Sequence, residues 1–151
     1  MKIFIDADGC PVVDLAISIA KEYKLKILIV KNYAHVIEDD YAKVVSVDIS
    51  RDSADFFIVN KVKESDIVVT QDYGLATICL AKNARVINEN GLFYTKENID
   101  GMLNRRHLHR ELRKQGKYHS KSKKRQALSD VSFKNSLKEL IEKQVKTIDN
   151  F

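Results

Sequence analysis

Acidic side chains stand at the ends of two apolar runs of this chain. Residues 3–5 are followed by Asp6 and Asp8, and residues 67–69 lead to Asp72. Such runs predict buried strands of a parallel sheet, whose carboxyl ends share the edge where ligands bind. Gathered carboxylates repel one another unless a hard cation lies between them, and Mg²⁺ and Mn²⁺ prefer oxygen ligands. The pattern therefore predicts a divalent-metal site.

Each of these acids could instead have a local structural role. Asp8 precedes Gly9 and suits a turn or a helix cap as well as it suits metal ligation. Asp6 is favoured as a ligand, because an isolated Asp at the end of a buried strand has little structural use without a partner. Asp72 precedes a predicted helix and could be its N-cap, worth about 1 kcal/mol. One side chain cannot fill both roles well.

A third carboxylate is expected from residues 52–55. Asp52 and Asp55 have the spacing of a helix-capping arrangement, in which Asp52 is by default the cap. If the start of this helix faces the sheet edge, Asp55 or Asp52 supplies the third carboxylate, and Ser53 with the free backbone N–H groups could hold a phosphate. Which of the two acids faces the site stays open.

The cysteines and histidines favour no other chemistry. Cys10 lacks both the later Arg of a C-x₅-R phosphatase and the second Cys of a dithiol motif, so we expect a small buried thiol. Cys10 and Cys79 are expected to stay reduced. For His107, His109 and His119, which have no Cys partners at zinc spacing, phosphate contact or solvent exposure is expected.

Positive charge is concentrated in one segment. The 151-residue chain has a net charge of +5, yet residues 1–100 are net acidic. Against the single acid Glu111, residues 105–125 contain Arg105, Arg106, Arg110, Arg113, Lys114, Lys117, Lys121, Lys123, Lys124 and Arg125. An acidic pocket beside such a strip suits a polyanionic substrate, because the strip attracts phosphates. We therefore expect nucleic acid as the partner.

Strands and helices must alternate to position these residues. Hydrophobic periodicity predicts strands over 2–6, 26–30, 44–47, 66–70 and 85–87, with helices over 11–23, 52–62 and 73–82. On the last of these helices, Leu75, Ile78 and Cys79 are expected to point inward. The alternation predicts right-handed crossovers and a mainly parallel sheet covered on both faces, which is a three-layer α/β sandwich.

Residues 101–151 are expected to form a basic helical extension, packed on a core made of residues 1–100. A helix from about 95–98 to Gly116 has a partial apolar seam that includes Ile99 and Leu108. Residues 117–130 are polar and aperiodic, which predicts a mobile loop. A last helix, with apolar residues at helical spacing from Phe133 to Ile148, should pack on the domain or against another copy of the chain.

With these residues assembled, the chain resembles the YaiI/YqxD family of small bacterial proteins, which is placed with the PIN-like nuclease fold. The matching stretches are residues 6–12, 52–55, 66–76 and 98–100 with the arginines that follow. The resemblance implies acidic residues at strand ends that bind Mg²⁺ or Mn²⁺ for RNA cleavage. It places Asp6 and Asp72 in the outer positions and residues 52–55 in the middle one. The basic extension lies outside the PIN core, so no role is implied for it.

The leading functional prediction is a metal-dependent ribonuclease or related phosphodiesterase, with ions held by Asp6, Asp72 and Asp55 and supported by Asp8. A haloacid-dehalogenase-like phosphatase is an alternative, with Asp6 as nucleophile, Asp8 as acid and Thr70 as phosphate-binding hydroxyl. It needs a later strand that ends in paired acids, which residues 88–90 do not clearly provide. A second alternative is an RNA-binding or ribosome-associated module without catalysis.

Neither a membrane span nor a signal peptide is expected. No stretch approaches the roughly 18 consecutive apolar residues that a spanning helix needs, and the first strand leads directly to Asp6 and Asp8 without a cleavable small-residue site. We therefore expect a soluble, cytoplasmic protein.

Overall fold

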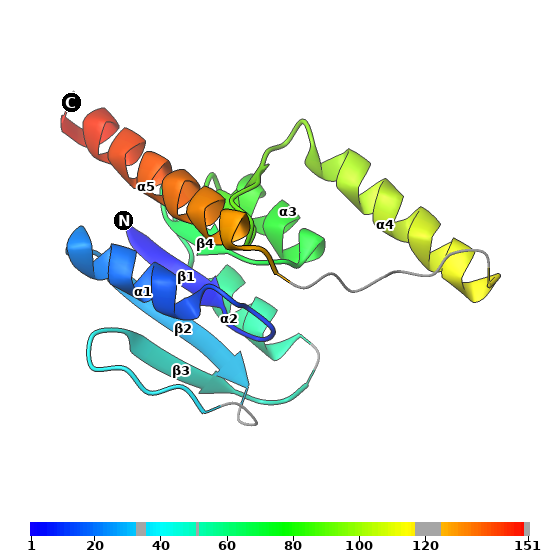
Figure 1. Ribbon diagram of the computed structural model, residues 1–151, viewed down its shortest axis with the longest axis horizontal. Helices are drawn as coiled ribbons and strands as arrows, with labels where there is room; N and C mark the ends of the chain where they lie inside the picture. Colours follow the sequence, from blue (N-terminus) through cyan, green and yellow to red (C-terminus); the bar gives the residue numbers. More distant parts are fainter. Residues whose placement is uncertain (33–35, 51, 117–124, 150–151) are drawn as a thin grey trace.

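The protein folds around one six-stranded sheet with five helices in the described residues of the computed structural model, which are 1–32, 36–50, 52–116 and 125–149 (Figure 1). In chain order the elements are β1 (Lys2–Asp6), α1 (Val13–Glu22), β2 (Lys26–Asn32), β3 (Lys43–Val47), α2 (Ser53–Lys61), β4 (Ile67–Val69), α3 (Tyr73–Ala81), β5 (Arg85–Ile87), β6 (Phe93–Tyr94), α4 (Ile99–Lys114) and α5 (Ala127–Asp149). Among the described residues, no helix is both long and apolar enough to cross a membrane.

The sheet has the order β3-β2-β1-β4-β5-β6, and its first five strands are parallel. Only β6 runs antiparallel, beside β5; this two-residue strand is too short to show a period in the sequence. The central position of β1 and β4 explains why their residues are apolar on both faces. The predicted α/β class with a mainly parallel sheet is confirmed.

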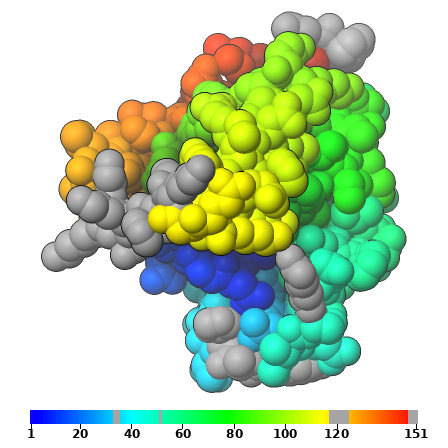
Figure 2. Space-filling model, turned by 90° about the vertical axis from the view of Figure 1, so that its right-hand side faces the viewer, coloured from blue at the N-terminus to red at the C-terminus, as the bar shows by residue number. Residues whose placement is uncertain are grey.

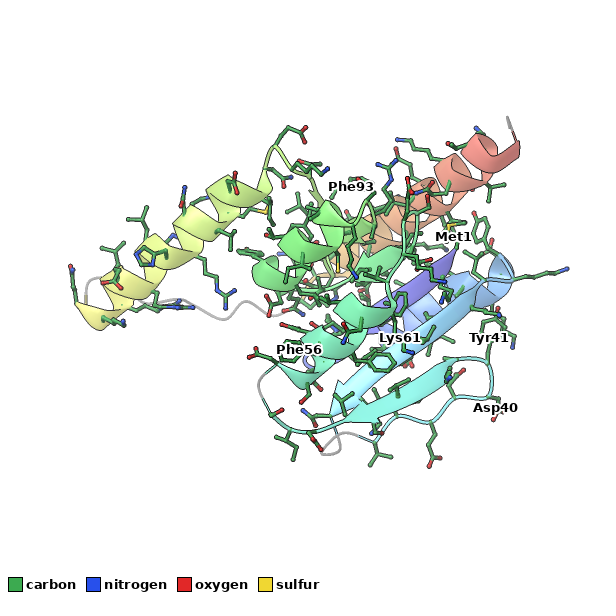
Figure 3. All side chains as sticks on the ribbon, turned by 180° about the vertical axis from the view of Figure 1, so that it is seen from behind. Met1, Asp40, Tyr41, Phe56, Lys61 and Phe93 are labelled. Carbon is green, nitrogen blue, oxygen red and sulfur yellow. The ribbon has the colours of Figure 1, made fainter. Side chains whose placement is uncertain are left out.

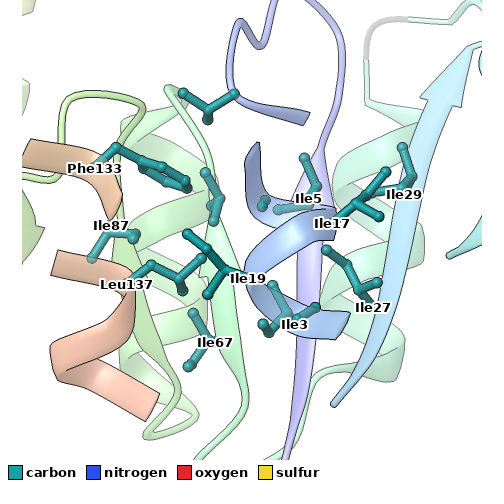
Figure 4. Close-up of a cluster of buried hydrophobic side chains, with 14 of the residues drawn as sticks. Ile3, Ile5, Ile17, Ile19, Ile27, Ile29, Ile67, Ile87, Phe133 and Leu137 are labelled. Carbon is teal, nitrogen blue, oxygen red and sulfur yellow. The ribbon is translucent and has the colours of Figure 1, made fainter. Parts of the chain in front are cut away.

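Helices cover both faces of the sheet. Ile3 and Ile5 face a core formed with α1 and α5, which includes Phe133 and Leu137 (Figure 4). Phe4 faces the second core, formed with α2, α3 and the start of α4. Because side chains alternate along a strand, Asp6 points to the same side as Phe4, toward α2 and α3. The three-layer prediction is confirmed, and the alternation fixes the side on which Asp6 lies.

Two apolar residues that were predicted to be buried are exposed. Ile78 on α3 is 46% exposed, because this helix packs through Leu75, Ala76, Cys79 and Leu80 instead. Leu108 on α4 is 58% exposed. Figure 1 shows the reason: the start of α4 packs on the domain, whereas its second half extends beyond the sheet and away from the other described elements.

The last helix begins earlier than the sequence suggests. α5 starts at Ala127, so the final residues of the loop predicted over 117–130 are helical, and residues 117–124 lie outside the described part of the chain. As predicted, α5 packs back on the domain. Phe133, Leu137, Leu140 and Ile141 are buried against the layer that contains α1, whereas the side chain of Ile148 is not among those described.

Candidate functional site

Asp6 and Thr70 occupy adjacent strand ends. Ile5 of β1 pairs with Val69 of β4. Asp6 and Thr70, which follow them, therefore lie side by side at the carboxyl edge of the sheet. The Thr70 hydroxyl donates a hydrogen bond to Asp6 Oδ2 at 2.8 Å and accepts one from the backbone N–H of Asp72 at 3.0 Å. Thr70 is buried, so this geometry makes it a positioning residue and does not support the phosphate contact predicted for it.

Asp72 is the N-cap of α3, as its local interpretation predicted. Its Oδ1 accepts hydrogen bonds from the N–H groups of Gly74, at 2.8 Å, and Leu75, at 3.1 Å. A Cβ at Gly74 would lie 3.2 Å from this oxygen, so glycine leaves room for the tight cap. Both cap bonds use Oδ1, and neither uses Oδ2.

The structure distinguishes between the two acids of α2. Asp52 occupies the N-cap position of α2, as predicted, but its side chain accepts no cap hydrogen bond. Asp55, in the first turn, faces the sheet edge. Burial first, and then the charges of Asp72, Asp6 and Asp52, raise its pKa to about 6. Ser53 shares a hydrogen bond with the hydroxyl of Ser50, and its phosphate contact stays a prediction.

The ionised form of Asp6 is also disfavoured, by burial and by neighbouring negative charges. Burial raises its pKa to about 6; the Thr70 hydrogen bond opposes this rise, whereas Asp8 and Asp72 add to it. Asp8 is exposed and accepts a long hydrogen bond of 3.4 Å from the Asn32 N–H at the end of β2. Asp72 is therefore close enough to both Asp6 and Asp55 for its negative charge to disfavour their ionised forms.

This set of donors fits a hard divalent cation by its chemistry, because it consists of carboxylate oxygens whose repulsion a cation would relieve. Its geometry is not that of a closed metal site. Within the described ranges, no three His, Cys, Asp or Glu side chains are already clustered so that they could hold a metal ion. Ion binding would therefore require side-chain movement.

Basic side chains of α4 line the same hollow as three of the acids, which do not include Asp6 or Asp8. This acidic hollow, of about 440 Å³, is bounded by Asp52, Asp55 and Asp72 on one side and by Arg106, His107 and Arg110 on the other. Among the described residues, no ion pair joins these arginines to the three acids. The hollow therefore presents both signs of charge.

A second hollow lies on the other side of Arg106. This cationic hollow, of about 460 Å³, has Gln71, Arg105, Arg106, His109 and Arg113 as its polar lining and Tyr73, Leu92 and Met102 as its apolar lining. The Arg106 guanidinium lies over the Tyr73 ring, 5.8 Å from its centre. Figure 2 shows this side of the molecule, with α4 in yellow lying above the blue N-terminal segment.

The predicted basic strip thus separates into distinct parts. Arg105 and Arg113 line the cationic hollow, Arg110 lines the acidic hollow, and Arg106 lines both. Lys114 lines neither and lies 3.7 Å from Glu111 in an ion pair. The predictions for Lys117, Lys121, Lys123 and Lys124 fall outside the described residues, as does His119.

Arg125 is a structural residue, and its predicted contact with nucleic acid is not supported. Its Nε donates to Asp130 Oδ1 at 2.8 Å, its Nη1 to Asn90 Oδ1 at 3.0 Å and its Nη2 to the Glu89 carbonyl at 2.7 Å. The guanidinium therefore ties the start of α5 to the β5–β6 turn.

Sequence reasoning did not identify Gln71 and Tyr73 as site residues. Gln71 Nε2 donates to the Gly9 carbonyl at 3.1 Å, and Tyr73 meets the ring of Tyr94 edge-on. The sequence feature that could have indicated these two residues is their position on either side of Asp72. In contrast, the buried Asp66 lies at the opposite end of β4 and accepts from the N–H groups of Lys2 and Lys63, which is a structural role.

Both cysteines are free thiols, as predicted. Burial raises the pKa of Cys10 to about 11 and that of Cys79 to about 12. A thiol with such a pKa is almost entirely protonated at neutral pH and is therefore a poor nucleophile.

The fold and site define a small α/β protein with an acidic sheet edge beneath a basic helix. The chain belongs to the YaiI/YqxD family, described as uncharacterised, whose model matches residues 4–143. The match includes α4 and most of α5, so the basic extension is part of the family.

Relatives of similar length support this assignment. The UPF0178 protein of Natranaerobius thermophilus is 48% identical over 141 residues, which are 93% of this chain and 96% of that protein. The UPF0178 protein of Enterococcus faecalis is 40% identical over 151 residues, 96% of this chain and all of that protein. Among solved structures, Rae1 (YacP) from Bacillus subtilis aligns with 94% of this chain and 99% of that chain, at 16% identity and a TM-score of 0.44, which is too distant to support a functional argument.

Proposed function

We propose that this protein is a divalent-metal-dependent ribonuclease or a related phosphodiesterase that acts on RNA. One observation carries the proposal: burial and the charge of Asp72 raise the pKa of both Asp6 and Asp55 at one sheet edge, and α4 arginines line the same hollow as Asp55 and Asp72. Carboxylates suit a cation and arginines suit phosphate oxygens. A metal-bound phosphodiester would use both charges.

The residues of the site have separable roles in this proposal. Asp6, Asp55 and Asp72, with Asp8 in support, would hold Mg²⁺ or Mn²⁺, which supplies Lewis acidity and lowers the pKa of a bound water. Thr70 fixes Asp6 and joins it to the start of α3. Arg106 and Arg110, which line the hollow beside Asp55 and Asp72, would stabilise negative charge that develops on the phosphate.

Binding without catalysis is the second candidate. It is favoured by the engagement of Asp72 in a helix cap and by the absence, among the described side chains, of a ready metal-binding cluster. The phosphatase alternative is less well supported, because the Thr70 hydroxyl that it needs is buried and already hydrogen-bonded.

Cleavage of labelled single-stranded RNA with Mn²⁺ or Mg²⁺ tests the proposal. Asp6→Asn and Asp55→Asn should each lower the rate at least ~100-fold, because each removes a ligand charge. The matched control is Asp40→Asn, an exposed acid at the end of the sheet away from α4 (Figure 3), which should retain the wild-type rate. Equal rates in all four proteins would refute the nuclease, and RNA binding that survives chelation without any cleavage would favour the binding module.

A further inference from the structure

The cationic hollow contains the chemistry of a nucleotide site, although it lies outside the acidic edge. Its polar lining includes Arg105, Arg106 and Arg113 and no carboxylate. Its apolar lining, which includes Tyr73, offers a surface for a planar ring. Phosphate recognition by arginine and base stacking on tyrosine are the two interactions by which proteins bind single-stranded nucleic acid.

The size of the hollow also suits a small unit of a polymer. About 460 Å³ falls within the range of pockets that enclose small ligands. A base inside a duplex has both faces covered by its neighbours, so it cannot reach Tyr73 without unstacking. The hollow should therefore select unpaired nucleotides.

Arg106 connects this hollow to the acidic one. It lines both and lies over the Tyr73 ring, so a strand that passes Arg106 would enter one hollow on each side of it. We propose that the cationic hollow binds one unpaired nucleotide of an RNA strand whose neighbouring phosphate lies in the acidic hollow. Tyr73 is the base platform, and Arg105 and Arg113 hold the phosphate. The polymer's identity rests on the function proposed above.

Binding of a fluorescent oligouridine in EDTA tests this site without cleavage. The variant Arg105→Ala/Arg113→Ala should weaken binding at least ~10-fold. The negative slope of log affinity against log salt concentration should become shallower by about 1.4, because two phosphate contacts are lost. Its control, Lys134→Ala/Lys146→Ala, removes the same charge from exposed positions of α5 and should change affinity less than ~3-fold. Equal losses of affinity in the two variants would mean that binding depends on general electrostatic attraction, and this would overturn the inference.

The base platform requires a separate comparison. Tyr73→Leu should weaken oligouridine binding ~5- to 100-fold, whereas Tyr73→Phe, which keeps the aromatic face, should bind as the wild type does. An abasic oligonucleotide of equal charge should not distinguish the three proteins, and a duplex should bind more weakly than the single strand. Because Tyr73 packs on Tyr94, thermal melting must show that each variant is folded at the assay temperature. An equal effect of Tyr73→Leu on the abasic probe would contradict stacking.

This inference and the proposed function fail in different ways. If oligouridine binding depends on Arg105, Arg113 and Tyr73 but no cleavage occurs with either metal, the nucleotide site stands and the nuclease does not. If Asp6→Asn abolishes cleavage while Arg105→Ala/Arg113→Ala binds and cleaves as the wild type does, the nuclease stands and the nucleotide site is refuted.

Discussion

Asp6 is held in an environment that disfavours its charge. Its ordinary pKa of 3.8 rises to about 6, mainly through burial. An acid whose pKa is higher in the folded than in the unfolded state binds protons more tightly when folded, so ionisation destabilises the fold. The stabilising contribution of the protonated form is full below pH ~4 and is lost as the pH rises to about 6.

Removing this charge should therefore stabilise the protein. In Asp6→Asn the amide oxygen can still accept the Thr70 hydrogen bond, while the repulsion from Asp8 and Asp72 disappears. At pH 7.5 without metal we expect a gain of about 1–2 kcal/mol, or a melting temperature higher by about 3–6 °C. The gain should shrink toward pH 4. Thermal unfolding followed by circular dichroism checks this, and a variant no more stable than the wild type at pH 7.5 would contradict it.

The positions of the acids could be predicted from the sequence only in part. Asp6 and Asp72 could be predicted, because strand ends are visible as breaks in apolar runs and parallel strands share an edge. The choice between Asp52 and Asp55 could not, because it depends on how α2 is rotated against the sheet. Nor could the dual use of the Thr70 hydroxyl, because both of its partners are set by tertiary packing.

At the scale of elements, the docking of α5 on the β5–β6 turn shapes the border of the cationic hollow. Gly91 in this turn has a φ of +83° and accepts a hydrogen bond at its carbonyl from the Ser136 hydroxyl at 2.7 Å. Arg125 fixes the neighbouring residues 89 and 90. Leu92, which follows, lines the hollow. The last helix therefore supports a turn that borders the proposed nucleotide site.

Gly91→Ala should disrupt this docking. The added Cβ would lie 2.5 Å from the Ser132 carbonyl oxygen in a left-handed backbone conformation, and both effects oppose folding. We expect a loss of about 3 kcal/mol or more. Gly101→Ala is the matched control: its Cβ would meet nothing within 4 Å on α4, and alanine favours a helix by roughly 0.5–1 kcal/mol. Urea unfolding of both variants measures the difference, and similar stabilities would refute a tight α5 contact.

Periodicity predicted the regular elements better than their contacts. The first five strands and the first three helices follow apolar runs or repeats that local sequence displays directly, whereas the two-residue β6 shows none. Leu108 continues the apolar repeat of α4, yet it lies in the half of the helix that extends beyond the sheet. An apolar repeat does not show where the layer that it packs against ends. Arg125 was assigned to the basic strip because its sequence neighbours are basic. Its hydrogen bonds to Asn90 and Glu89, which lie 35 and 36 positions earlier in the chain, could not be predicted from those neighbours.

At the scale of the whole molecule, an acidic edge and a basic helix face one another without ion pairs among the described residues. Neutralisation by a shared ligand is the simplest reason for a fold to tolerate this arrangement. A cation would relieve the repulsion between the acids, and a phosphate would neutralise the arginines. A bound cation would reduce the negative charge that repels a phosphate, and a bound phosphate would reduce the positive charge that repels a cation. Each ligand would therefore increase the affinity for the other.

This view makes metal binding dependent on pH. Ligand carboxylates must be deprotonated, and Asp6 and Asp55 both have a pKa of about 6, so protons compete with the metal below that value and release it. Saturating Mn²⁺ at ~100 times its dissociation constant should stabilise the protein by about 2.7 kcal/mol at pH 7.5, raising the melting temperature by about 5–10 °C. At pH 5 the same Mn²⁺ concentration should have little effect.

In Asp6→Asn/Asp55→Asn the gain in stability from Mn²⁺ should vanish at both pH values, whereas Asp40→Asn should keep it. A rise that is independent of pH, or that persists in the double variant, would place the ion elsewhere on the molecule and leave the acidic edge without its proposed ligand.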